Sequence, residues 1–126
     1  MNTTLYRPVG LKEHDLIAES GYTAFPPRLD WQPIFYPVLN ADYAAQIARD
    51  WNTKDLASDY IGFVTAFDVD SAYVVQFEEH VVGGPNHREL WVPAEELITF
   101  NSHIQGKIRV EAVFYGEKYT GKRGSH

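Results

Sequence analysis

The spacing of apolar residues predicts two amphipathic helices in the first half of the chain. Over residues 41–51 apolar side chains recur at the i, i+4 interval of one helical face, and Asn40 precedes this segment as an N-cap. The predicted buried face consists of Tyr43, Ala44, Ile47, Ala48 and Trp51. A shorter amphipathic helix is predicted over residues 11–20, with Gly21 as its C-terminal cap.

Short strands are predicted on both sides of these helices. Residues 5–9 are predicted to form an edge strand, because Pro8 cannot donate a hydrogen bond to a sheet. Further strands are predicted over residues 33–38, 60–69, 72–82, 89–92 and 106–115. In the last strand, alternation predicts that the inward-facing residues are Ile108, Val110, Ala112 and Phe114.

The connecting segments are rich in glycine, proline and aromatic residues. Residues 83–86, with the sequence Gly-Gly-Pro-Asn, give the strongest turn signal, and a small helix is predicted over residues 94–100. Residues 22–32 contain adjacent prolines and three aromatic residues, a composition typical of packed loops that line pockets. Because strands and helices do not alternate regularly, we expect an α+β fold with a small, mixed, mainly antiparallel split sheet and two or three short helices.

Length and composition bound the class of protein. The chain has 126 residues, of which 44% are hydrophobic, so we expect one domain over residues 1–116 and a flexible tail over residues 117–126. The net charge of −6 argues against nucleic acid as the main partner, because nucleic-acid readers concentrate Lys and Arg. The lack of cysteine fits the cytoplasm, and no apolar run approaches the roughly 20 residues that span a membrane.

Candidate chemistry lies in a combination of residues rather than in a standard motif. The sequence has no glycine-rich nucleotide-binding motif, no metalloprotease motif and no serine-hydrolase motif. Its five histidines lack regular metal-ligand spacing, so we expect no metal. What stands out is Arg7 on the first strand, Tyr36 on the strand before the clearest helix, and Glu89 behind the glycine turn.

The order of these features resembles the catalytic core of ADP-ribosyltransferases, a superfamily that cleaves NAD. The resemblance covers roughly residues 4–115, and it is carried by Tyr6-Arg7, Phe35-Tyr36, Tyr43-Ala44, Ile47-Ala48 and Glu89 followed by Pro93. The opening residues also resemble those of small bacterial proteins labelled ADP-ribosylation/crystallin J1. The resemblance implies an enzyme that uses NAD as its substrate, without a metal, and either transfers ADP-ribose to an acceptor such as a protein or hydrolyses NAD.

The resemblance also implies a role for each candidate residue. Arg7 would bind phosphate or ribose, Tyr36 would frame the nicotinamide, and Glu89 would be the catalytic carboxylate. A carboxylate suits that place because cleavage of the glycosidic bond of NAD creates an oxocarbenium-like cation on the ribose. Tyr22 and Tyr43 are further candidates for contacts with NAD, and His87, two residues before the glutamate, would select the acceptor.

Two other classes of function stay open at this point. A non-catalytic binding, regulatory or immunity-type protein would keep the fold and use its acidic surface to recognise a basic partner. A hydrolase or isomerase would use Glu89 and His87 as acid and base, since residues two apart on a strand share one face. The candidates also have structural interpretations: Arg7 as an ion-pair partner, Tyr36 as a core aromatic, and Trp51 and Trp91 as core residues. The oligomeric state is left open.

Overall fold

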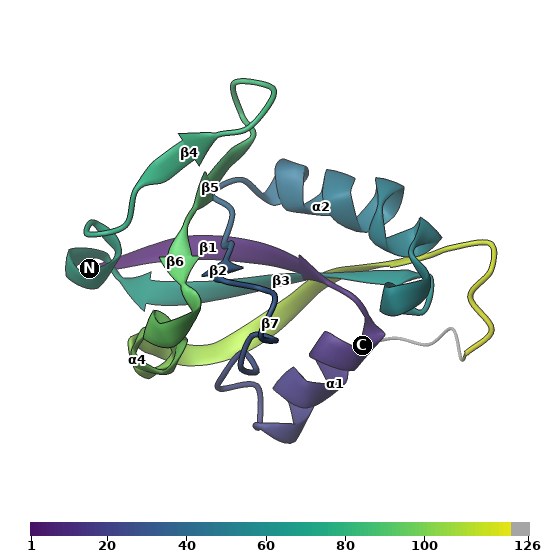
Figure 1. Cartoon of the computed structure of the whole chain (residues 1–126), viewed down its shortest axis with the longest axis horizontal. Helices are drawn as coiled ribbons and strands as arrows, with labels where there is room; N and C mark the ends of the chain where they lie inside the picture. The colour runs from purple at the N-terminus through teal and green to yellow at the C-terminus, as the bar shows by residue number, and fades with distance from the viewer. Residues whose placement is uncertain (122–126) are drawn as a thin grey trace.

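The computed structural model describes residues 1–121, and this part of the chain has the expected α+β architecture (Figure 1). Its antiparallel central sheet has the strand order β1 (Asn2–Val9), β3 (Ile61–Asp70) and β7 (Ile104–Tyr115). The four α-helices of the described part are α1 (Leu11–Glu19), α2 (Ala41–Asp50), α3 (Ser71–Val74) and α4 (Leu97–Ser102), one more than the largest number expected. None of these described helices combines the length and the apolar character needed to cross a membrane.

Two short antiparallel pairs lie beside the central sheet. They are β2 (Ile34–Phe35) with β6 (Val92–Pro93), and β4 (Glu79–Val81) with β5 (Arg88–Leu90). The described part also contains 3₁₀ turns at Asn52–Lys54, Leu56–Ser58 and Ala94–Glu96.

Residues 37–39 join the hairpin β4–β5 to the outer edge of β1. On one side, Val38 exchanges backbone hydrogen bonds of 2.9 and 2.7 Å with Tyr6. On the other side, the Leu39 N–H donates to the Arg88 carbonyl at 3.0 Å, and the Leu90 N–H donates to the Pro37 carbonyl at 2.8 Å. These bonds bring Glu89, in the middle of β5, into line with the first strand.

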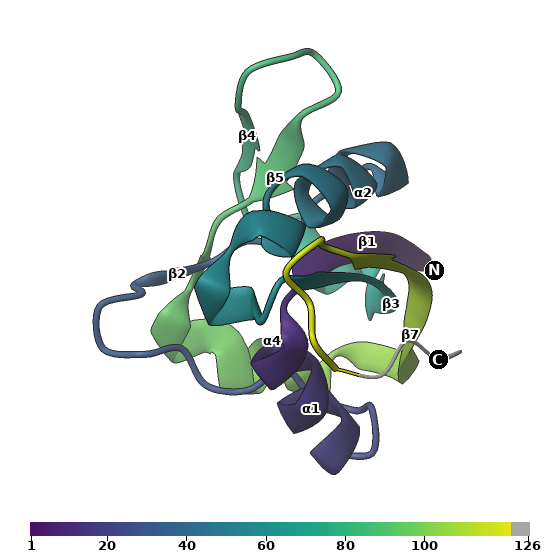
Figure 2. The ribbon, with the colours of Figure 1, turned by 90° about the vertical axis from the view of Figure 1, so that its right-hand side faces the viewer.

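One face of the sheet is covered by α1, α4 and the loop that leads to β2 (Figure 2). The aromatic core on this face consists of Phe25, Phe35, Phe63, Phe67 and Phe100, all of which are buried. Their rings meet at angles, with centroids 4.8 Å apart for Phe25 and Phe67 and 5.5 Å apart for Phe35 and Phe100. The large side chains of this face therefore come from a loop, two strands and a helix that are distant in sequence.

Helix α2 covers the opposite face. Asn40 caps its N-terminus as predicted, because the Asn40 side chain accepts hydrogen bonds from two backbone N–H groups of the first turn. Ala44 and Ala48 of α2 are fully buried, and a Cβ added to Gly62 of β3 would lie 2.5 Å from the Ala48 carbonyl oxygen. Small residues thus allow the helix backbone to lie directly against the sheet.

The predicted strand over residues 72–82 is wrong for most of its length. Residues Ser71–Val74 form α3, and only Glu79–Val81 is a strand. The Tyr73 ring stacks on His103 at 3.7 Å and its hydroxyl donates to Glu96 at 2.6 Å, while Val75 is exposed. Packing of Tyr73 against the α4 region therefore overrides the local alternation of apolar residues.

The predicted inward face of the last strand is also wrong. Ile108 and Val110 face the phenylalanine cluster, whereas Ala112 and Phe114 pack on the side of α2. The cause is a bulge: Val64 pairs with residue 112 and Thr65 with residue 110, so Glu111 is left between them. An extra residue in one strand moves the following side chains to the other face.

Part of the predicted tail lies against the fold. The Tyr119 ring lies 5.2 Å from the Tyr115 ring, measured between ring centres, and the backbone N–H of Tyr119 donates to the Gly116 carbonyl at 3.1 Å. Of the predicted tail, residues 122–126 lie outside the described residues.

Candidate functional site

A cleft of about 740 Å³ opens beside the outer edge of β1. Its walls are the β1–α1 junction, the loop around residues 26–32, the end of α2 with the turns that follow it, and the hairpin β4–β5. Arg7, Tyr36 and Glu89 all line this cleft, although they belong to three separate segments of the chain. The structure therefore brings together the three residues to which the resemblance gave catalytic roles.

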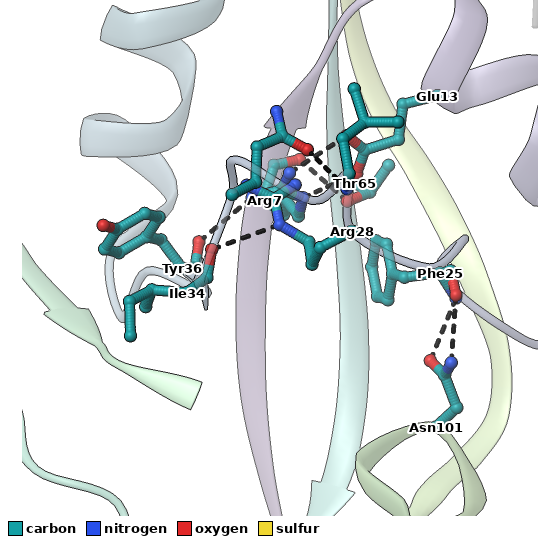
Figure 3. Close-up of polar contacts among 10 residues, drawn as sticks. Arg7, Glu13, Phe25, Arg28, Ile34, Tyr36, Thr65 and Asn101 are labelled. Carbon is teal, nitrogen blue, oxygen red and sulfur yellow. Dashed lines mark hydrogen bonds and ion pairs between the residues drawn. The ribbon is translucent and has the colours of Figure 1, made fainter. Parts of the chain in front are cut away.

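Arg7 forms a forked ion pair inside the cleft wall (Figure 3). Its Nε donates to Glu13 Oε2 at 2.6 Å and its Nη2 donates to Glu13 Oε1 at 2.9 Å. Its Nη1 lies 3.4 Å from the Tyr36 carbonyl oxygen, and its guanidinium carbon lies 4.7 Å from the centre of the Phe35 ring. The Glu13 carboxylate of α1 therefore occupies the guanidinium fork that a phosphate would otherwise use. The Arg7 side chain is only 11% exposed.

Arg28 lies next to Arg7 and was not among the residues predicted from the sequence. Its Nε donates to the Ile34 carbonyl at 3.1 Å (Figure 3). Burial lowers the pKa of Arg28 from its usual value, the positive charge of Arg7 lowers it further, and the carboxylate of Glu13 opposes both effects. The available signal was its position directly after Pro26 and Pro27, in a loop already expected to line a pocket.

Glu89 is connected to Arg7 through Trp91 and Tyr36. The indole N–H of Trp91 donates to Glu89 Oε1 at 3.0 Å. The Trp91 ring meets Tyr36 edge to face at 6.1 Å and stacks on His80 at 3.7 Å. Contacts therefore run from Arg7 through Tyr36 and Trp91 to the carboxylate.

The other predicted site residues lie outside this cleft. Tyr43 stacks on His87 with ring centres 4.4 Å apart, and the His87 Nδ1 accepts a hydrogen bond from the Gly84 N–H. Burial raises the pKa of Tyr43, and the negative charge of Glu89 adds to the effect. Tyr22 packs against the phenylalanine core and has a left-handed backbone conformation, with φ of 61°. Neither the two tyrosines nor the histidine lines the cleft.

Large apolar side chains surround the mouth of the cleft. The exposed ones that line it are Leu16, Leu29, Tyr36, Trp51, Val82 and Trp91. The expectation that Trp51 and Trp91 are core residues is wrong, since they are 60% and 41% exposed. Trp51 occupies the C-cap position of α2, where the chain turns away from the sheet. Exposed apolar groups gathered around a concavity are typical of a binding site.

The wall next to α2 contributes a buried polar group. The Asn52 amide donates to Ser58 Oγ at 3.0 Å, and that hydroxyl donates to Asp55 at 2.7 Å. Asn52 is 4% exposed, and its side-chain oxygen has no hydrogen-bond partner within the described chain. A buried acceptor without a donor costs free energy, and its burial keeps this oxygen off the surface of the cleft.

Comparisons with protein-family models, with curated proteins and with solved structures find no match for this chain. The function must therefore be inferred from the chemistry of the cleft. Within residues 1–121, no group of three or more His, Cys, Asp or Glu side chains is placed to hold a metal ion. The cleft offers guanidinium groups for an anion, aromatic rings for a planar group, and the Glu89 carboxylate for hydroxyl groups or a cation.

Proposed function

We propose that the cleft binds NAD and that the chain is an ADP-ribosyltransferase-like protein, which transfers ADP-ribose to an acceptor or to water. The observation that carries the proposal is the meeting of Arg7, Tyr36 and Glu89 in one cleft. These residues were selected from the order of motifs in the sequence, and the order contains no information about distance in space. The proposal includes an ADP-ribosyltransferase-like fold and a location in the cytoplasm, which suits a chain without cysteine.

The size and lining of the cleft support a dinucleotide. A volume of about 740 Å³ lies within the range of about 300–1,000 Å³ that small-molecule and cofactor sites occupy. A dinucleotide has two planar rings, two ribose groups and a negatively charged diphosphate. Tyr36, Trp51 and Trp91 provide exposed aromatic surface for the rings, and the arginines provide positive charge for the diphosphate.

In the proposed reaction the bond between the ribose and the nicotinamide nitrogen breaks. The bonding electron pair leaves with nicotinamide, which becomes neutral, and positive charge develops on the ribose. The Glu89 carboxylate stabilises this charge and accepts a hydrogen bond from a ribose hydroxyl. Water or an acceptor then bonds to the ribose carbon and releases a proton. Trp91 fixes Oε1 of the glutamate, and Oε2 has no hydrogen-bond donor within the described residues.

The test is to titrate the protein with NAD by calorimetry and to measure nicotinamide release by chromatography. We expect Glu89→Gln to keep the binding of NAD and to slow nicotinamide release by at least about 100-fold, because one group that stabilises the transition state is typically worth that much. Glu95→Gln is the matched control, since Glu95 is exposed and does not line this cleft. Failure of millimolar NAD to bind would contradict the proposal.

A second candidate is a non-catalytic binding or regulatory protein that retains the fold. It is favoured by the Arg7–Glu13 ion pair, which occupies the arginine expected to hold phosphate, and by the exposed apolar residues around the cleft. Binding of NAD with no release of nicotinamide, in the wild type as in Glu89→Gln, would support this candidate over an enzyme.

A further inference from the structure

Two neighbouring arginines line the same end of the cleft, and they differ in how far the protein itself uses them. Arg7 has all three of its guanidinium nitrogens engaged, two by Glu13 and one by the Tyr36 carbonyl. Arg28 makes one hydrogen bond within residues 1–121, from Nε to the Ile34 carbonyl. Its two terminal nitrogens, which can donate four hydrogen bonds, have no partner among the described residues.

The charges around Arg28 leave an excess of positive charge. The chain as a whole has a net charge of −6, yet the charged groups that act most strongly on Arg28 are the Arg7 guanidinium and the Glu13 carboxylate. Glu13 is already bound to Arg7 in a forked pair, so it neutralises that arginine first. Lys12 also lines the cleft. A partly buried guanidinium with a second arginine beside it is stabilised by an anion that neutralises the positive charge and accepts two hydrogen bonds from the guanidinium.

The loop that carries Arg28 is held at both ends. At its start, Phe25 and Asn101 exchange two hydrogen bonds, of 2.9 Å from the Phe25 N–H and 3.0 Å to the Phe25 carbonyl (Figure 3). At its end, the Ala94 N–H donates to the Pro33 carbonyl at 2.9 Å next to the β2–β6 pair. Pro26 and Pro27 restrict the backbone immediately before the arginine. The backbone that carries Arg28 is therefore already ordered, so little backbone entropy is lost when a ligand binds.

We propose that Arg28 is the diphosphate-binding residue of the cleft, and that Arg7 is a positioning residue that adds positive charge behind it. The terminal nitrogens of Arg28 donate to oxygens of the diphosphate, while Arg7 stays paired with Glu13. The inference rests on the proposed function, because NAD is the diphosphate proposed for this cleft. Diphosphate binding needs no bond cleavage, so the two proposals can fail separately.

The test uses two probes without nicotinamide, ADP-ribose and inorganic pyrophosphate, and measures their affinities by calorimetry at low salt. We expect Arg28→Gln to weaken both by at least about tenfold, because a charge-assisted forked contact is lost. Arg28→Lys keeps the charge without the fork and should give an intermediate affinity. Arg109→Gln removes the same charge on β7 away from the cleft and should change neither affinity by more than about twofold.

The outcomes separate this inference from the proposed reaction. Wild-type affinity in Arg28→Gln overturns the inference, as does an equal loss in Arg28→Gln and Arg28→Lys, which points to a purely structural role. Failure of the wild type to bind either probe also overturns it. A loss confined to the Arg28 variants, in a protein that releases no nicotinamide from NAD, supports the diphosphate site and contradicts the reaction.

Discussion

The two faces of the central sheet are closed in opposite ways. Toward α1 and α4 the space is wide and is filled by buried phenylalanines from several segments, whereas α2 lies so close that Ala44, Ala48 and Gly62 leave no space for larger side chains. The stability of the first face depends on filling its volume, so we expect a substitution that removes side-chain atoms to destabilise it. The stability of the second face depends on close contact between two backbones, so we expect a substitution that adds side-chain atoms to destabilise it. The cleft opens at the edge of β1, where neither form of packing closes the molecule.

The largest expected effect is on the phenylalanine face. Phe67 is fully buried and its ring contacts those of Phe25 and Phe100. We expect Phe67→Ala to lower the free energy of unfolding by about 3–5 kcal/mol, because it removes buried surface and leaves a cavity. Phe67→Leu should cost less, since it leaves a smaller cavity. Urea denaturation measures both free energies of unfolding. Equal losses of stability in the two variants would contradict the view that this face is stabilised by filling its volume.

A smaller effect is expected from one added methyl group on the α2 face. In Gly62→Ala the new Cβ would approach the Ala48 carbonyl oxygen, which belongs to the helix backbone and cannot rotate away. We expect a loss of about 1–3 kcal/mol in the free energy of unfolding. Gly84→Ala is the control, since its nearest neighbour is a His87 ring atom at 3.6 Å. If both variants unfold at the same denaturant concentration, the close contact of α2 is not limiting.

The smallest effect concerns a polar link that crosses all three strands. Asp68 on β3 accepts hydrogen bonds from the Thr4 hydroxyl at 2.7 Å and from Arg109. These donors, the Thr4 bond first, hold the pKa of Asp68 below its usual value. A lowered folded-state pKa stabilises the protein above the unfolded-state pKa, and this stabilisation is lost as the pH falls through the folded-state pKa.

Replacement of this carboxylate tests the link. We expect Asp68→Asn to lower the free energy of unfolding at pH 7 by on the order of 0.5 kcal/mol, since the group is partly exposed. The difference between wild type and variant should shrink between about pH 5 and the lowered pKa. Denaturation at several pH values measures this, and a difference that grows in acid would contradict the assigned direction.

The sequence predicted best the elements that local patterns determine. Helix α2 follows from Asn40 and the i, i+4 spacing, and the strand at Ile61–Asp70 follows from alternation. The segment around Tyr73 could not be predicted in this way, because contacts with His103 and Glu96 decide its conformation. The change of face in β7 could not be predicted either, since a single unpaired residue leaves no mark on the apolar pattern.

The same division holds for the cleft. The residue types and their order suggested that Arg7, Tyr36 and Glu89 form one site, and all three line one cleft. The role proposed for Arg28 depends on a fact that no local pattern contains, namely that Glu13 already binds its neighbour Arg7. The exposure of Trp51 was missed for a related reason: hydrophobicity predicts burial, but an apolar side chain beside a cleft can stay in contact with solvent.

The junction at residues 37–39 determines the geometry of the cleft. Four backbone hydrogen bonds connect this segment to β1 on one side and to β5 on the other. Arg7 belongs to the sheet and Glu89 belongs to the hairpin, so this segment sets the distance between these two residues. Val38 and Leu90 are each only 2% exposed, so water does not compete for the hydrogen bonds of this segment. The folded backbone therefore fixes the spacing of Arg7 and Glu89 at the cleft.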